Sequence, residues 1–316
     1  MEYKIHFAPL QGYTDNVYRE AHAQVFGGVE FYYTPFVRLE KGGFRNKELR
    51  DILPSGSGCC RVVPQLIAAT PEEFRQIAAL FYANGYRRAD INLGCPFPMQ
   101  ARLHRGAGIL PFIDEAEALL NTVEEFPQIQ FSVKLRLGWE TADESRVLLP
   151  VLNRLPLEHI TLHPRLGVQQ YKGSVDMDGF TAFYQACKHP LFYNGDIETQ
   201  EDIRDITSQF PLLKGIMSGR GLLAHPWLAV EYEKGKELSA VERKEMLETF
   251  HARLLTGYQA RLEGGEHQVL AKLKTVWDYL LPQADKKLRK KILKSNTLDA
   301  YCQSVKELFR VYPFIG

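Results

Sequence analysis

The chain has 316 residues, which is enough for one large domain or two ordinary ones. Its 39 basic and 38 acidic residues nearly cancel, and this balance excludes a uniformly basic coat for nucleic acid. A hydrophobic content of 45% excludes a wholly disordered chain, and no apolar run approaches the ~18 residues of a membrane span. Five cysteines, an odd number, argue against a disulfide framework, so we expect a reducing, cytoplasmic location.

Residues 1–238 alternate short apolar runs with amphipathic helical patterns. Eight apolar runs joined by helices over ~230 residues predict a (β/α)8 barrel, the TIM barrel. A doubly wound sheet is the alternative, but the Gly-x-Gly-x-x-Gly motif expected after its first strand is missing. The predicted strands are 5–8, 30–33, 61–66, 89–92, 130–135, 159–162, 191–193 and 215–217. The predicted helices are 71–84, 113–125, 143–153, 200–209 and 222–231.

Residues 239–316 show no strand pattern and hold 14 basic against 9 acidic residues. Helical patterns at 240–262, 268–281, 286–293 and 298–309 predict a smaller, all-helical C-terminal domain after a barrel that occupies residues 1–238. The basic run at 286–294 is, taken alone, more typical of a solvated helix face. Trp277 and Tyr279 either pack in the core of this domain or line a groove, and helical spacing favours packing for Trp277.

Polar residues or glycines follow every predicted strand, and the carboxyl ends of strands are where a barrel carries its chemistry. Lys134, at one strand end, is placed to stabilise an anion on an aromatic cofactor ring. Cys95 lies on a Gly-Cys-Pro turn, where a thiol can give or take one proton. The last two strands end in glycine-containing turns that let a phosphate approach backbone N–H groups, and Arg220 adds charge there.

Each of these residues also has an ordinary explanation. A single cysteine such as Cys95 is more often a small buried hydrophobe. Lys134 can simply pair with a carboxylate, and His163 can be a hydrogen-bonded core residue. The vicinal Cys59 and Cys60 have no further Cys or His at ligand spacing nearby, so we expect no metal site.

Together, the strand-end motifs resemble those of the tRNA-dihydrouridine synthases, a family of FMN-dependent barrel enzymes. The resemblance covers most of the chain, and its most specific motif is Asn92-Leu93-Gly94-Cys95-Pro96. The other motifs are Ala8-Pro9-Leu10-Gln11-Gly12-Tyr13-Thr14-Asp15, Lys134-Leu135-Arg136, His163-Pro164-Arg165, Asn194-Gly195-Asp196 and Ser218-Gly219-Arg220.

The resemblance implies reduction of the 5,6 double bond of a uridine in tRNA, with FMN as cofactor and NADPH or NADH as reductant. A hydride would pass from the flavin to C6, and Cys95 would protonate C5 from the opposite face. A monomer that binds tRNA, without a metal or a membrane, is expected. The residues implied at the FMN are Pro9, Leu10, Gln11, Gln65, Lys134, His163, Asn194, Gly195, Asp196, Gly219 and Arg220.

The same resemblance implies a set of RNA contacts. Arg38, Asn92, Arg136 and Arg165 would hold the target uracil and a nearby phosphate. The target base must be turned out of the folded tRNA, so a second surface has to hold the RNA backbone. The basic C-terminal domain fits that need, through the 286–294 helix face and through Lys272 and Lys274.

The chain departs from the family pattern at three places. Leu10 replaces the usual Met, and Pro164 replaces a Gly, which removes one N–H near the flavin. The loop at 97–105 lacks the Lys that the family commonly has after the cysteine, and Arg102 or Arg105 would take its place.

Three other functions are weighed against this one. A flavin-dependent small-molecule oxidoreductase of the dihydroorotate-dehydrogenase type would share FMN and Lys134 but would not need a basic helical domain. A non-catalytic RNA-binding protein is opposed by the intact set of Cys95, Lys134 and His163. A flavin-free aldolase that forms a Schiff base at Lys134 is a more distant alternative.

Overall fold

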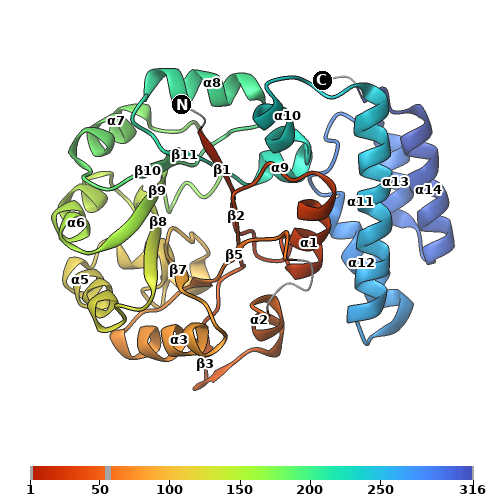
Figure 1. Cartoon of the computed structure of the whole chain (residues 1–316). Coiled ribbons are helices and arrows are strands. Elements are labelled where there is room, and N and C mark those ends of the chain that lie inside the picture. The colour runs from red at the N-terminus through yellow and green to blue at the C-terminus, as the bar shows by residue number, and fades with distance from the viewer. Residues whose placement is uncertain (1–2, 54–57, 315–316) are drawn as a thin grey trace.

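The computed structural model describes residues 3–53 and 58–314, and it confirms the predicted barrel and the helical region that follows it (Figure 1). The strands of the barrel are β1 (Lys4–Phe7), β2 (Phe31–Tyr33), β5 (Val62–Val63), β6 (Gln65–Leu66), β7 (Arg88–Leu93), β8 (Gln130–Gly138), β9 (Leu157–Leu166), β10 (Leu191–Tyr193) and β11 (Gly215–Ser218). All of the strand pairs between them are parallel.

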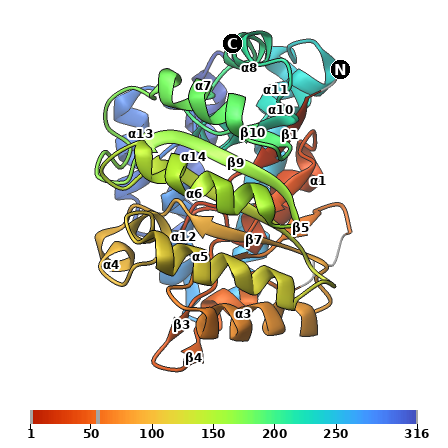
Figure 2. The same ribbon diagram turned by 90° about the vertical axis from the view of Figure 1, so that its left-hand side faces the viewer.

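Helices surround this ring, and α3, α5 and α6 lie across its outer face in Figure 2. The elements outside the ring are α1 (Asn16–Val25), a small hairpin of β3 (Leu39–Glu40) and β4 (Gly43–Phe44), α2 (Asn46–Asp51), α3 (Pro71–Ala83), α4 (Pro98–Ala101), α5 (Ile113–Asn121), α6 (Asp143–Arg154), α7 (Met177–Ala186), α8 (Gln200–Gln209), α9 (Arg220–Ala224) and α10 (Leu228–Lys234). Short 3-10 turns cover Gly106–Ile109 and Thr122–Glu125.

The strand pairing shows how the barrel closes and where one of its strand positions is divided. β1 pairs with both β2 and β11, so the first and last strands of the barrel lie side by side. β5 pairs with β2 and β6 pairs with β7, and Pro64 separates these two halves of one strand position. Because proline has no N–H to donate, it divides the strand where the ring passes from one neighbour to the other.

Side chains that point into the barrel form layers, as closed parallel barrels require. The deepest layer is polar: the Tyr33 hydroxyl lies 3.3 Å from His6 Nδ1 and 3.0 Å from His159 Nε2. Burial lowers the pKa of His159 to about 3, so this imidazole is neutral at physiological pH. Asn92 and Lys134 are opposite one another in the β7–β8 register and lie nearer the carboxyl ends of the strands.

Two differences from the predicted elements have local causes. The single helix expected at 222–231 is divided into α9 and α10, because Pro226 disfavours helical backbone at His225, which has φ −130° and ψ 79°. α7 was not predicted, since Gly179 and Thr181 weaken its helical propensity; the Asp176 side chain caps it by accepting from Gly179 N–H.

The C-terminal region consists of α11 (Ala240–Arg261), α12 (Gly265–Val276), α13 (Lys286–Lys294) and α14 (Leu298–Val311), which Figure 1 shows beside α1 of the barrel. A capping box formed by Ser239 and Glu242 begins α11. Arg243 of α11 donates from Nε to Glu231 of α10 at 2.7 Å, and both side chains are buried. Trp277 is fully buried, as its spacing predicted. None of the helices among the described residues is long and apolar enough to cross a membrane.

Ion pairs connect α11 and α12 to the barrel at a contact that we call the joint, made of Asp15, Asp51, Tyr258, Arg261 and Lys272. The Tyr258 hydroxyl donates to Asp15 at 3.1 Å, and the Lys272 ammonium lies 3.0 Å from the same carboxylate. Arg261 donates to Asp51 at 3.1 Å. Each carboxylate of the barrel in the joint therefore has a cationic partner in the helical region.

Candidate active site

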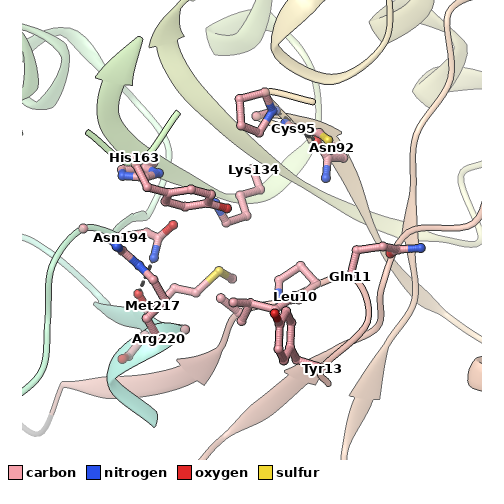
Figure 3. A pocket seen from close by; sticks show the side chains of 18 of the residues that line it. Leu10, Gln11, Tyr13, Asn92, Cys95, Lys134, His163, Asn194, Met217 and Arg220 are labelled. Atoms are coloured by element: carbon pink, nitrogen blue, oxygen red, sulfur yellow. Dashed lines mark hydrogen bonds between the residues drawn. The ribbon is translucent and has the colours of Figure 1, made fainter. Parts of the chain in front are cut away.

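A pocket opens at the carboxyl ends of the barrel strands, and it brings the predicted site residues together (Figure 3). Every residue expected at the cofactor lines it, as do Cys95, Asn92 and Arg136. Figure 3 shows Cys95 and Asn92 on one side of the space and Asn194, Met217 and Arg220 on another. Residues far apart in the sequence meet here because parallel strands end at the same rim.

Cys95 is held on a rigid turn with a protonated thiol. The Asn92 side-chain oxygen accepts from the N–H groups of Gly94, at 3.0 Å, and Cys95, at 2.8 Å. Gly106, at φ +63°, packs against the cysteine so closely that a Cβ there would lie 2.7 Å from Cys95 Cβ. Burial raises the pKa of the Cys95 thiol. At neutral pH the group therefore carries a proton that it can donate.

Lys134 supplies a positive charge without a dedicated partner. Burial, helped by the neighbouring Arg136, lowers the pKa of its ammonium to about 8. No described residue forms a hydrogen bond or an ion pair with Lys134 Nζ. A buried charge of this kind is costly unless something binds against it, so its position favours an anion or a developing negative charge in the pocket.

His163 and Arg136 lie on the same rim, where His163 is neutral and Arg136 is positively charged. Burial and four neighbouring cations hold the pKa of His163 well below its usual range, so the imidazole is neutral. The Arg136 guanidinium donates to the backbone oxygens of Gly94, Leu166 and Gln170 at 3.0, 2.9 and 2.7 Å. These bonds fix the guanidinium in one orientation at the edge of the pocket.

Unpaired donors gather at the ends of β10 and β11. The N–H groups of Gly195 and Gly219 donate to no acceptor within the described ranges 3–53 and 58–314. A Cβ on Gly219 would lie 3.1 Å from Leu10 Cδ1, so glycine keeps the backbone open on this side. Arg220 lies 2.8 Å from Asp196 and extends the cationic edge.

These donors fit an anionic cofactor with a ring that accepts hydrogen bonds. Free N–H groups beside an arginine suit a phosphate group. Buried Gln11 Oε1 has no hydrogen-bond partner, and it therefore calls for a donor from a bound molecule. Leu10 and Met217 give the pocket an apolar surface against which an aromatic ring system can pack.

Three tyrosines also line the pocket and were not assigned to it from the sequence. Tyr171 lies between two guanidinium groups, 5.3 Å from Arg136 and 4.8 Å from Arg220. Tyr279, from the segment between α12 and α13, packs edge-to-face on Tyr13 with ring centroids 5.0 Å apart. The helical region therefore forms part of the pocket wall. The sequence offers no periodic signal for such loop residues.

Two arginines that the sequence placed near the RNA, and the two loop arginines offered in place of the missing lysine, have different surroundings in the structure. Arg38 is buried, with its Nε 3.8 Å from Glu48. Arg165 is buried against Asp196. Arg105 binds a carboxylate of α3 and the backbone oxygen of Leu39, so of the two candidates to replace the missing loop lysine only Arg102 is exposed.

The two lysines of α12 are engaged inside the molecule. Lys272 belongs to the joint, and its ammonium also donates to the Gly12 oxygen at 2.5 Å. Lys274 donates to the Ser295 oxygen at 2.5 Å. Lys272, Lys274, Arg38 and Arg165 therefore do not line the pocket. Asn92 and Arg136 also have internal partners, but both line it.

The described residues contain no group of three or more His, Cys, Asp or Glu side chains that could hold a metal ion. In particular, Cys59 is exposed and Cys60 is buried, so the vicinal pair does not present both thiols to one side.

A family model described as dihydrouridine synthase matches residues 6–310. The chain belongs to the dihydrouridine synthase family. The resemblance that the motifs suggested is therefore confirmed over nearly the whole chain.

Curated relatives agree with this assignment, and a solved structure shares the barrel fold. A tRNA-dihydrouridine synthase B from Pseudomonas aeruginosa is 27% identical and is matched over 96% of this chain and 91% of its own. A tRNA-dihydrouridine(16) synthase from Pseudomonas putida is 28% identical over 74% of each chain. Morphinone reductase, 12% identical, superposes with a TM-score of 0.55 over 75% of this chain and 86% of its own, which shows a shared barrel fold.

Proposed function

We propose that this dihydrouridine synthase reduces a uridine of tRNA with FMN as its cofactor, NADPH or NADH as the reductant and Cys95 as the proton donor. Membership of the family gives the class of reaction, an oxidoreductase that forms dihydrouridine in tRNA. The observation that carries the residue roles is one pocket holding a protonated thiol, an unpartnered ammonium and unpaired backbone donors.

From these hydrogen-bond donors we propose which residues face each end of the cofactor. Gly195, Gly219 and Arg220 would hold the phosphate through N–H groups and a guanidinium. Lys134 and Gln11 would face the ring, the first against its developing negative charge and the second as an acceptor for a ring N–H. When bound, FMN supplies the hydride that adds to C6 of the uracil.

The chain's own residues then complete the reduction. Adding a hydride to C6 leaves negative charge at C5 and the neighbouring carbonyl, and this charge is quenched by one proton. Cys95 donates that proton from its buried thiol, which Asn92 holds in place. The fixed guanidinium of Arg136 and the Asn92 amide orient the uracil, since both line the pocket.

The tRNA body would rest on the helical region, which we propose as a tRNA-binding domain at 239–316 beside a catalytic barrel at 1–238. Lys286, Lys287, Lys290 and Lys294 of α13 are exposed, whereas Leu288 and Ile292 turn inward. A row of free ammonium groups suits phosphate contacts that position the RNA without reading its sequence. We expect the protein to act as a cytoplasmic monomer.

An anaerobic titration tests this function. The protein is purified, its flavin is reduced, and the visible absorption band is recorded after unmodified bulk tRNA is added. We expect the oxidised band to return with tRNA but not with orotate or free uridine. A return with orotate alone would replace this proposal with the small-molecule oxidoreductase. A protein that neither contains nor binds FMN would overturn the cofactor assignment.

A further inference from the structure

Asp90 is a fully buried carboxylate of β7 that lies behind the pocket and does not line it. It faces the interior of the barrel between the neighbouring strands β6 and β8. Its Oδ2 accepts from Gln65 Nε2 at 2.7 Å, and its Oδ1 accepts from the Ser132 hydroxyl at 2.5 Å. Both oxygens therefore have donors, and the group is built into the barrel without touching the substrate side.

A chain of hydrogen bonds connects Asp90 to the turn that carries Cys95. Gln65 Oε1 accepts from Asn92 Nδ2 at 2.7 Å. Asn92 Oδ1 accepts from the N–H groups of Gly94 and Cys95. The direction of every bond follows from the Cys95 end, because backbone N–H groups only donate. Asn92 Oδ1 must accept from them, so Asn92 Nδ2 donates to Gln65 Oε1 and Gln65 Nε2 donates to Asp90.

This direction decides what the two amides present to the pocket. With Gln65 Oε1 and Asn92 Oδ1 both occupied, the remaining hydrogens of Gln65 Nε2 and Asn92 Nδ2 are the groups free to bind a ligand. Both residues line the pocket, so this wall offers donors. If Asp90 were replaced by a donor, both amides would have to turn over, and the N–H groups of Gly94 and Cys95 would lose their acceptor.

Asp90 also lies next to Lys134 in the sheet. In the β7–β8 register Asp90 is opposite Ser132, and Lys134, two residues further along β8, turns to the same inner face. Among the described residues that act on the Lys134 ammonium, Arg136 lowers its pKa, whereas Asp90 and Cys95 raise it. Cys95 contributes a charge only when its thiol ionises, and burial raises the pKa of that thiol. Asp90 is therefore the carboxylate that holds Lys134 in its charged form. His163 is neutral and adds no charge.

The charge on Asp90 is itself sensitive to its surroundings. Burial raises the pKa of Asp90 to about 7, whereas the bonds from Gln65 and Ser132, and the charge of Lys134, lower it. Tyr33, the titratable group beneath it, stays protonated because burial raises the pKa of its hydroxyl well above the usual range. Loss of the Ser132 donor would therefore leave Asp90 more often neutral.

We propose that Asp90 is a positioning residue of the catalytic centre, which anchors the Gln65–Asn92 chain behind Cys95 and places a negative charge beside Lys134. The proposal rests on the proposed function for its consequence in catalysis. Its physical core, the coupling between Asp90 and Lys134, is a property of the protein with or without a bound cofactor.

The decisive experiment measures the titration of Lys134 in Asp90→Asn. The amide oxygen of Asn can still accept from Gln65, so this variant removes the charge and keeps the chain. The cofactor-free protein is labelled briefly with acetic anhydride between pH 6 and pH 10, and acetylation of Lys134 is measured by peptide mass spectrometry against the exposed Lys244. We expect the Lys134 titration to move down by about one pH unit, so that its labelling between pH 7 and pH 8, where wild-type Asp90 is ionised, rises about three- to fivefold.

Two further variants keep the test decisive. Asp51→Asn removes another buried carboxylate, in the joint, and should leave the Lys134 titration unchanged. If Asp90→Asn does not fold, Ser132→Ala preserves the carboxylate but removes its donor, and we expect a smaller shift in the same direction. An unshifted Lys134 in folded Asp90→Asn, or in Ser132→Ala when Asp90→Asn fails to fold, would overturn the proposal.

The loaded enzyme gives a second readout. In Asp90→Asn, the alkaline limb of tRNA-dependent flavin reoxidation should move down with the Lys134 titration, while KM for tRNA stays within about twofold, because Asp90 does not reach the RNA. A raised KM with an unmoved limb would contradict a positioning role. If wild-type flavin is not reoxidised by tRNA at all, the proposed function fails, and the labelling experiment still decides the inference.

Discussion

Two regions of this molecule bury charged groups in opposite ways. In the joint, Lys272 and Arg261 meet the carboxylates of Asp15 and Asp51 directly. In the pocket, the Lys134 ammonium forms no hydrogen bond or ion pair with any described residue, and Gln11 Oε1 is buried without a donor. Paired groups hold two parts of a chain together, whereas unpaired ones are available to a ligand. Whether a charged side chain has a partner therefore distinguishes a structural role from a ligand-binding one better than the type of residue does. The following variants test this distinction.

The largest effect is expected from Cys95→Ala, which removes the thiol that we propose as the proton donor. Turnover of tRNA should fall by about 10²–10⁴-fold, the usual contribution of a positioned acid. Single-turnover reoxidation of reduced flavin by tRNA measures it. Cys60→Ala is the matched control, since Cys60 is also a buried thiol but lies outside the pocket. Equal losses in both variants would contradict the role of Cys95.

Arg243→Met should give the largest loss of stability, because it leaves Glu231 buried without its ion-pair partner. The free energy of unfolding should fall by about 3–5 kcal/mol, as expected when one partner of a buried pair is removed. Urea unfolding measures the change. Lys244→Met, one residue further along α11, removes an exposed charge and should change stability by less than about 0.5 kcal/mol.

Lys134→Met tests the unpaired side of the comparison. The variant should lose about 10²–10³-fold in turnover, the range for a preorganised group that stabilises developing charge. Because burial lowers the pKa of Lys134 to about 8, the wild-type ammonium is charged below that pH and neutral above it. Wild-type turnover should therefore decline as pH rises through about 8. A pH–rate profile of Lys134→Met that kept the same alkaline limb would show that another group controls it.

The smallest effect is expected from Lys272→Met. This lysine donates to Gly12 and pairs with Asp15, so its loss should weaken the joint by about 1–2 kcal/mol. The variant should also retain flavin less well on gel filtration, because Lys272 holds the β1–α1 loop that carries Leu10 and Gln11. Lys274→Met is the control, because Lys274 binds only within the helical region. If both variants lose flavin equally, the joint does not support the pocket.

Much of the fold could be predicted because parallel strands buried on both faces have a strong local signal. The eight apolar runs at their spacing were enough to predict the barrel and the rim on which Cys95, Lys134 and Arg220 meet. The β3–β4 hairpin and α7 were missed, since a two-residue strand pair and a helix containing Gly179 lack a clear period. Local pattern therefore predicts elements best where burial is continuous.

The rest of the site could not be predicted, because its partners are distant in sequence. Charge and spacing made Lys272 a candidate for RNA, but its partner Asp15 lies 257 residues earlier and only the folded chain brings them together. Tyr279 was assigned to a core or a groove for the same reason, although it packs on Tyr13 in the wall of the pocket. The type of each side chain was enough to predict what chemistry it can do, but its role depends on the partners that the fold brings to it.

The shared wall formed by Tyr13 and Tyr279 has a consequence for the newly made protein. The barrel itself cannot close until β11 has left the ribosome to pair with β1, and the wall waits for a further 60 residues. Since domains form in the order in which they are synthesised, the nascent chain passes through a stage with its rim residues present and its pocket open. The pocket wall is therefore completed later than the barrel rim on which it stands.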